Sequence, residues 1–260
     1  MEKYFEKIDQ VPKEEILWNV PEQKQGTVAV IGGNSQNFRT SIKVAEYLTA
    51  NFPLREVGLV LPDVLEKSLP PLDNVKFLAS TDSGSFADEK ELAAELSAVD
   101  FGLMVGDFSK NAITAKAVAN AVKTAPRPLI ATRDAVDLLS EAQPERWLMN
   151  ENVILMASMA QLQKLFRAVY YPKMLMLTQS LMQVAEALHK FTLSYPVSII
   201  TLHDGQILIA KNGSVRALAL EKTTYSPLTL WGGEAAAKIM ALALYSPGQL
   251  MDAAAVALSA

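Results

Sequence analysis

The sequence predicts an α/β protein whose mainly parallel sheet ends in an antiparallel meander. Short β-branched runs alternate with amphipathic helical segments through most of the chain, an order typical of parallel sheets. Near the C-terminal end, Asp204-Gly205 and Asn212-Gly213 separate three apolar runs, and such dipeptides favour tight hairpin turns. No internal repeat or low-complexity linker divides the chain. We therefore expect a single domain over residues 1–260, with residues 1–25 as a polar N-terminal arm.

The individual elements follow from apolar periodicity and from the turn residues between them. Strands are expected at 27–31, 56–61, 75–78, 100–105, 128–132, 153–156, 197–202, 206–210 and 214–218. Helices are expected at 40–50, 88–98, 112–124, 135–139, 158–169, 173–190, 235–244 and 249–260, and Arg133-Asp134 is expected as a polar tip before the helix at 135–139. Parallel strands end at one common edge of the sheet, so ligand-binding loops are expected at that edge.

The composition argues against several classes of protein. A net charge of −4 offers no basic field, so nucleic acid is not an expected partner. The chain has no cysteine and only two histidines, His189 and His203, which excludes thiolate chemistry and argues against a multi-histidine metal site. No run approaches the ~20 apolar residues of a membrane span, and the N-terminus lacks a secretion signal. We expect a cytoplasmic protein without a membrane partner.

The strongest candidate for chemistry is Gly232-Gly233-Glu234, two glycines and a carboxylate before the helix expected at 235–244. The unpaired N–H groups and partial positive charge of a helix N-terminus can hold an anion, and Glu234 could then act as a base. Alternatively, the glycines only turn the chain, and Glu234 is a first-turn acid favoured by the helix dipole.

Further candidates follow the other strands. They are Gly32, Gly33 and Asn34 after 27–31, Gly106 and Asp107 after 100–105, Asp134 after 128–132, and His203 after 197–202. All of them follow strand ends, the edge at which a doubly wound sheet places its ligand site. Structural alternatives remain open, because Asn34 and Asp134 can cap helices and a loop aspartate often satisfies backbone groups. His203 precedes a hairpin and is expected to be an exposed turn residue.

The order of these segments resembles the ribokinase-like superfamily, and within it the ATP- or ADP-dependent NAD(P)H-hydrate dehydratases, over nearly the whole chain. Trp231-Gly232-Gly233-Glu234 is similar to the family's Gly-Ser-Gly-Asp, and Gly106 matches one glycine of its Gly-Pro-Gly loop. Residues 129–139 are similar to a Leu-Asp-Ala-Asp-Ala-Leu-Asn-Leu-Leu run, with Asp134 at the second aspartate. The resemblance implies a three-layer α/β/α sandwich and a homo-oligomer.

The resemblance also implies an activity. ATP or ADP with Mg²⁺ would phosphorylate the hydroxyl of hydrated NADH or NADPH, and loss of phosphate would restore the nicotinamide ring. Glu234 would take the hydroxyl proton, while the backbone N–H groups of Gly232, Gly233 and Glu234 would hold the transferring phosphoryl group. The remaining candidates would contact the nucleotide; these are Gly32, Gly33, Asn34, Gly106, Asp134 and His203.

Three features of the family are replaced in this chain. Thr132 stands at the first aspartate, and residues 156–161 keep nothing of the Thr-Pro-His-Pro-Gly-Glu motif. Leu202-His203-Asp204-Gly205 lacks the phosphate-facing lysine of Leu-Lys-Gly, for which His203 or a remote cation would have to substitute. Two alternatives therefore stay open: another small-molecule kinase, and a non-catalytic protein that binds a nucleotide or a protein partner.

Overall fold

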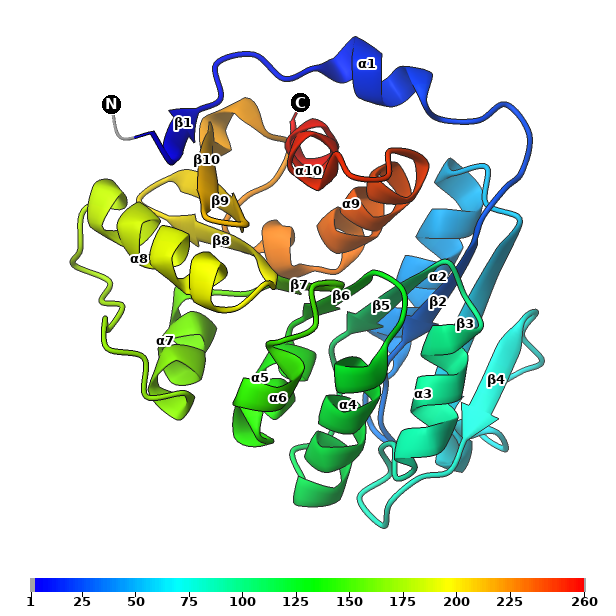
Figure 1. Cartoon of the computed structure of the whole chain (residues 1–260). Helices are drawn as coiled ribbons and strands as arrows, with labels where there is room; N and C mark the ends of the chain where they lie inside the picture. The colour runs from blue at the N-terminus through cyan, green and yellow to red at the C-terminus, as the bar shows by residue number, and fades with distance from the viewer. Residues whose placement is uncertain (1–2, 260) are drawn as a thin grey trace.

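A computed structural model describes residues 3–259, which form one ten-stranded sheet with helices on both faces (Figure 1). The strands are β1 (Phe5–Lys7), β2 (Thr27–Ile31), β3 (Glu56–Pro62), β4 (Val75–Leu78), β5 (Phe101–Val105), β6 (Leu129–Thr132), β7 (Val153–Met156), β8 (Ser198–His203), β9 (Gln206–Lys211) and β10 (Ser214–Ala219). Their order across the sheet is β1-β10-β9-β8-β7-β6-β5-β2-β3-β4.

The strand pairing confirms the expected mainly parallel sheet with a C-terminal meander. Strands β2 to β8 pair in parallel, whereas β8, β9 and β10 pair antiparallel. The two hairpins turn at Asp204-Gly205 and Asn212-Gly213, and all four residues have positive φ. That is the backbone a type I′ turn requires, which explains why these dipeptides predict the meander.

Ten α-helices and three short 3₁₀ helices accompany the sheet in the described residues. They are α1 (Lys13–Trp18), α2 (Arg39–Asn51), α3 (Glu89–Ser97), α4 (Ala112–Thr124), α5 (Asp134–Glu141), α6 (Pro144–Trp147), α7 (Met159–Ala168), α8 (Leu181–Ser194), α9 (Glu234–Tyr245), α10 (Leu250–Leu258), η1 (Asp63–Leu65), η2 (Leu220–Lys222) and η3 (Thr229–Trp231). Helices α1, α2, α9 and α10 cover one face, here the α9 layer, and α3 to α8 cover the other, here the α4 layer (Figure 1).

Alternation along the strands divides the core between these two layers. In β2, Ala29 and Ile31 pack in the α4 layer, whereas Val28 and Val30 pack in the α9 layer. Successive side chains of a strand point to opposite faces, so a central strand needs apolar residues at nearly every position. The continuous run of β2 meets that need and yields the three-layer α/β/α sandwich.

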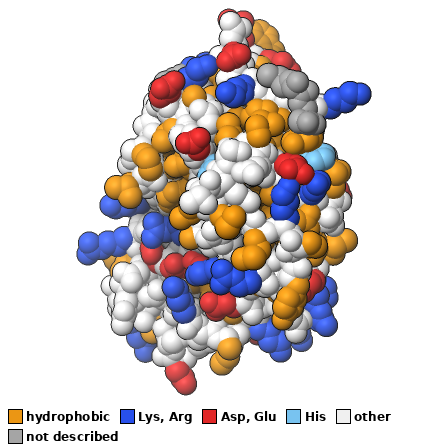
Figure 2. Space-filling model, turned by 90° about the vertical axis from the view of Figure 1, so that its left-hand side faces the viewer, with side chains coloured by type: hydrophobic (Ala, Val, Ile, Leu, Met, Phe, Trp, Pro, Cys, Tyr) orange, Lys and Arg blue, Asp and Glu red, His pale blue; other side chains and the backbone are white. Residues whose placement is uncertain are grey.

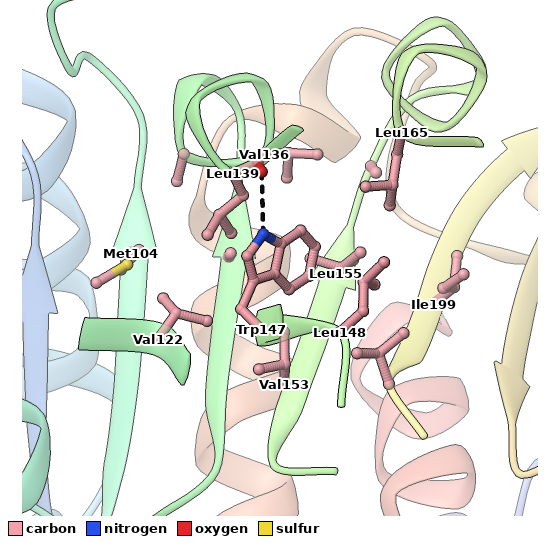
Figure 3. Close-up of a cluster of buried hydrophobic side chains, with 14 of the residues drawn as sticks. Met104, Val122, Val136, Leu139, Trp147, Leu148, Val153, Leu155, Leu165 and Ile199 are labelled. Atoms are coloured by element: carbon pink, nitrogen blue, oxygen red, sulfur yellow. Dashed lines mark hydrogen bonds between the residues drawn. The ribbon is translucent and has the colours of Figure 1, made fainter. Parts of the chain in front are cut away.

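Trp147, the last residue of α6, anchors the α4 layer beside Val153 at the start of β7, towards the amino edge of the sheet (Figure 3). Its side chain is buried, and its indole Nε1 donates to the carbonyl of Leu139 at 3.0 Å. Val136 and Leu155 pack beside the ring (Figure 3). The short helix α6, which the sequence did not predict, thereby ties the end of α5 to the sheet and fixes the direction in which α5 leaves β6.

Two segments differ from the expectation. The N-terminal arm contains a strand, because β1 pairs in parallel with β10, as well as the short helix α1. The helix expected at 173–190 begins only at Leu181, because the side chain of Ser180 accepts from the backbone N–H of Gln183 and caps α8. The segment before Ser180, from 170 onward, is therefore a loop and not a helix.

Candidate functional site

The loops after β2 and β5 meet at the carboxyl edge of the sheet. Asn34 donates from its side-chain amide to the carbonyl of Asp107, and its Oδ1 accepts from two backbone N–H groups of its own turn at 2.9 and 3.0 Å. A Cβ on Gly32 would stand 2.9 Å from the carbonyl oxygen of Gly106, so these two backbones are in close contact. Asn34 therefore joins two loops and does not cap α2. The fold thus brings together the candidates Gly32, Gly33, Asn34 and Gly106.

Arg133, directly after β6, covers the Gly106 backbone. A Cβ on Gly106 would stand only 2.1 Å from Arg133 Nε, so no other residue fits there without displacing the arginine. The guanidinium donates from Nη2 to Asp107 Oδ1 at 3.0 Å, while its buried Nε has no partner within residues 3–259. Arg133 also has a φ of 55°, which is rare outside glycine. The sequence marked this position only as a polar tip.

Thr132 places a buried hydroxyl beside Arg133. The residue is 1% exposed, and within the described chain its Oγ1 has no hydrogen-bond partner. Thr132 points to the same face as Ile130, which packs in the α9 layer, and it pairs with Val105 of β5. An unpaired buried hydroxyl carries a desolvation penalty of about 1–3 kcal/mol, which a ligand atom would relieve.

Helix α9 begins next to the ends of β5 and β6. Its N-cap is Gly233, whose φ of 99° suits glycine and whose absent Cβ would lie 2.8 Å from methyl groups of Val105 and Val44. Gly232, in contrast, is helical with a φ of −71°. No side chain of the described residues caps α9, so the N–H groups of its first turn remain available to an anion. Val105 thus lies between the Thr132 hydroxyl and the start of α9.

Glu234 is exposed at the first position of α9. Its carboxylate adds to burial in raising the pKa of Tyr47, and it contributes, after burial and Tyr47, to the raised pKa of Tyr225. Burial lowers the pKa of Lys238, an effect that the charge of Lys13 strengthens and that of Glu234 opposes. The carboxylate therefore lies near Tyr47 of α2 and near Tyr225, at the start of α9.

Asp134 is the first residue of α5 and caps nothing with its side chain. Burial raises the pKa of its carboxyl group, and the charge of Asp107 adds to that shift. Asp137, one turn later, instead pairs with Lys164 at 2.6 Å. The proton affinity of Asp134 thus responds to the charge of the loop after β5.

His203 is buried, so the expectation that it is an exposed turn residue is wrong. It belongs to β8, is 6% exposed, and its Nε2 lies 2.7 Å from the carbonyl oxygen of Gln179 in the loop before α8. Strand alternation turns it toward the α4 layer, as it does Ile199. The meander buries the residue because β8 extends to His203 before the turn begins.

Residues 156–161, where the resemblance placed a lost motif, have an identifiable structural function. Ser158 and Gln161 form a capping box at the start of α7. The amide Nε2 of Gln161 also donates to the carbonyl of Arg133 at 2.8 Å. This segment therefore holds the unusual backbone of Arg133 in place.

The donors at this edge suit an anion better than a metal ion. The guanidinium of Arg133, the hydroxyl of Thr132 and the first-turn N–H groups of α9 are all groups that bind phosphate. In the described part of the chain, no group of three or more histidine, aspartate or glutamate residues could hold a metal.

The surface shows no broad basic field on the face that carries α7 and α8. Acidic and basic side chains are interspersed there with hydrophobic ones (Figure 2). None of the helices within residues 3–259 has the length and hydropathy needed to span a bilayer.

Neither a protein-family model nor a curated protein matches this sequence. Solved structures do. A ribokinase-like superfamily protein from Enterococcus faecalis V583 is 14% identical with a TM-score of 0.63, over 98% of this chain and 86% of that one. Bacillus subtilis YxkO, of the UPF0031 family, is 17% identical with a TM-score of 0.64, over 95% and 86%. Bacillus subtilis pyridoxal kinase, solved with ADP, is 12% identical with a TM-score of 0.52, over 90% and 89%. The chain therefore has a ribokinase-like fold.

Proposed function

We propose that this protein catalyses nucleotide-dependent phosphoryl transfer to a small molecule at the carboxyl edge of its sheet. The observation that carries the proposal is the uncapped N-terminus of α9 on one side of Val105 and the buried, unpartnered hydroxyl of Thr132 on the other. Such an arrangement supplies fixed donors for the charge that develops on a transferring phosphoryl group. The structural similarity to Bacillus subtilis pyridoxal kinase also supports the proposal of phosphoryl transfer.

In this proposal each group has a distinct role. The N–H groups of Gly233 and Glu234 hold the transferring phosphoryl group. Arg133 supplies the cation that the missing lysine would supply in the family. Glu234 takes the proton of the substrate hydroxyl as its oxygen bonds to phosphorus, and the bond to the nucleotide leaving group breaks. Gly32, Asn34 and Gly106 line the nucleotide phosphates, with Asp134 close by.

For the substrate, we propose hydrated NADH or NADPH, with ATP or ADP and Mg²⁺ as donor. Support comes from the order of segments that resembles the NAD(P)H-hydrate dehydratases and from the glycine-glycine-acid turn at α9. Phosphorylation of the ring hydroxyl followed by loss of phosphate would regenerate the reduced nicotinamide. A different hydroxyl substrate on the same scaffold is the nearest alternative, because the family's substrate-side motif at 156–161 is replaced.

The test is to incubate the purified protein with hydrated NADH, Mg²⁺ and ATP or ADP, and to follow the return of NADH absorbance. A known hydrate dehydratase serves as the positive control. We expect recovery of NADH with one of the two donors. If NADH does not return but the protein still hydrolyses the nucleotide, or transfers its phosphate to another hydroxyl compound, the hydrate is rejected as substrate. The proposal of phosphoryl transfer would then be retained.

A non-catalytic role is the second candidate, and it rests on the contact between Arg133 and Asp107. The ion pair partly neutralises the guanidinium that would have to meet a phosphate. Calorimetric titration with ATP, ADP, NADH and NADPH distinguishes this case, since a structural protein binds none of them and a nucleotide-binding one binds without turnover.

We also propose a cytoplasmic, single-domain protein that forms homo-oligomers. The loop between α7 and α8 supports association, because Tyr170, Met174 and Leu177 are each more than half exposed. Light scattering on the purified protein measures the mass of the particle, and a monomer at all concentrations would contradict the proposal.

A further inference from the structure

We infer that a second ligand site lies at the amino edge of the sheet and binds a small zwitterion with an apolar side chain, an α-amino acid. A pocket of about 420 Å³ opens there, where β5, β6, β7 and β8 begin and where α9 turns into α10. This volume is in the range of small-molecule sites. The edge is opposite to the loops that hold the proposed phosphoryl-transfer site, so the inference does not rest on that function.

The floor of the pocket is apolar with one polar atom. Phe101, Ile154 and Leu250 line it and are almost fully buried. Ser198, also in the lining, is 1% exposed, and its Oγ has no hydrogen-bond partner among residues 3–259. Ser198 pairs with Ile154 and points to the same face of the sheet. A buried hydroxyl without a partner at the base of an open pocket indicates a ligand atom that completes its hydrogen bond.

The rim of the pocket carries charges of both signs. Arg127 and Lys211 line it together with Asp100 and Glu151. No ion pair is formed by Arg127, Lys211 or Glu151 within the described chain, so their charges are not already neutralised by a direct partner. Asp100 is held in the ionised state, because hydrogen bonds from the backbone N–H and hydroxyl of Thr27 lower its pKa.

The charge pattern selects the class of ligand. A nucleotide or another polyanion would be repelled by Asp100 and Glu151, and a simple cation would be repelled by Arg127 and Lys211. A zwitterion satisfies both pairs: its carboxylate meets the two cations and its ammonium group meets the two carboxylates. The apolar part of the floor, at Phe101 and Leu250, then receives a side chain of the size of leucine, and one carboxylate oxygen reaches past it to accept from Ser198 Oγ.

The test compares three probes of similar shape with the full-length protein, by saturation-transfer NMR and calorimetric titration without nucleotide. L-leucine carries both charges, isocaproate lacks the ammonium group, and isoamylamine lacks the carboxylate. We expect L-leucine to bind at least about tenfold more tightly than either analogue. Equal binding of all three, or binding of none, would overturn the inference.

Matched variants then locate the binding. Ser198→Ala removes the buried hydroxyl in the pocket, and Thr201→Val removes another unpartnered buried hydroxyl of the same strand that does not line it. We expect about two- to tenfold weaker L-leucine binding for Ser198→Ala and no change for Thr201→Val. Arg127→Gln, at an exposed position that does not endanger folding, should also weaken binding, whereas the exposed Lys123→Gln should not. Identical affinities in all four variants would place the ligand elsewhere.

Discussion

Arg133 shows how much of the carboxyl edge depends on one residue. A non-glycine residue with φ of 55° carries strain on the order of 1–3 kcal/mol, and such strain persists only where neighbours hold it. Here Gln161 binds its carbonyl and Asp107 binds its guanidinium. The side chain is thereby kept over Gly106, where the proposed function requires a phosphate-binding cation.

Substitution of Gly106 tests this packing. Gly106→Ala places a methyl group 2.1 Å from Arg133 Nε, so the arginine must move. Gly205→Ala is a matched control, since Gly205 also has positive φ but has open space around it. We expect Gly205→Ala to lower the free energy of unfolding by about 1 kcal/mol, and Gly106→Ala to lower it by at least twice that amount. Urea denaturation measures both, and equal losses would contradict the contact.

Substitution of Glu234 tests its role as a base. Glu234→Gln keeps the size of the side chain and removes its proton acceptor, so kcat should fall by about 10²–10⁴-fold while nucleotide affinity changes little. Glu221→Gln, at another exposed glutamate shortly before α9, is the control and should retain full activity. If Glu234→Gln kept its kcat, another group would have to accept the proton.

Two aspartates should respond to pH in opposite directions. Burial raises the pKa of Asp134, so the folded state binds its proton more tightly and stability falls as pH rises through the folded pKa. Asp134→Asn should therefore raise Tm at neutral pH and leave it unchanged below the ordinary pKa of 3.8.

The Thr27 hydrogen bonds lower the pKa of Asp100, so Asp100→Asn should lower Tm at neutral pH. That difference should vanish as pH falls through the lowered pKa. Thermal melts across this pH range would show both trends, and parallel curves would contradict them.

The glycine turns of the site are visible in the sequence, but their partners are not. Gly106 follows a recognisable strand and Gly233 precedes a recognisable helix, so their place at the carboxyl edge could be predicted. Arg133 and Thr132 could not, because their importance lies in one unusual φ and in a missing hydrogen bond, which only the packed structure shows. His203 was misplaced because a strand can extend to the last residue before a hairpin turn.

At the scale of elements, α8 illustrates how a cap sets a helix boundary. The apolar and methionine-rich run from 173 onward is compatible with a helix, and periodicity alone did not locate its start. Ser180 and Gln183 form the capping box that does, and the same sequence spacing starts α7 at Ser158. The strands of the meander were predicted nearly to the residue, because their turns carry a specific backbone requirement.

Removal of the α8 cap should have a measurable effect. Ser180→Ala leaves the N–H of Gln183 without its acceptor, so we expect a loss of about 1 kcal/mol in the free energy of unfolding. Thr178→Ala, two residues earlier in the exposed loop, should change stability by less than about 0.5 kcal/mol. Chemical denaturation distinguishes them, and a loss for Thr178→Ala as large as for Ser180→Ala would argue against the cap.

At the scale of the whole molecule, β1 closes one edge of the sheet. Val215 donates its backbone N–H to the carbonyl of Tyr4, and Ile8 donates to that of Ala217. The sequence did not predict this strand, because β1 has only three residues and its partner β10 is more than 200 positions away. Short strands at a sheet edge protect longer neighbours from pairing with other chains.

Deletion of residues 1–10 should expose the edge of β10. We expect concentration-dependent association of the shortened protein, seen as a rise in mass by light scattering. Phe5→Ala with Ile8→Ala is the control, because it removes buried side chains but keeps the backbone pairing. That variant should lose stability without gaining mass. Association of both, or of neither, would show that the backbone edge is not the cause.

Helix α9 reaches from one edge of the sheet to the other. It begins at Glu234 next to the ends of β5 and β6 and ends at Tyr245 beside the amino-edge pocket, a length of roughly 18 Å for its 12 residues. Ligands at its two ends would both contact α9. If either one shifts the helix, thermodynamic linkage requires each ligand to change the affinity for the other by the same factor. A metabolite bound beneath α9 would then tune phosphate binding above it without sharing a single contact.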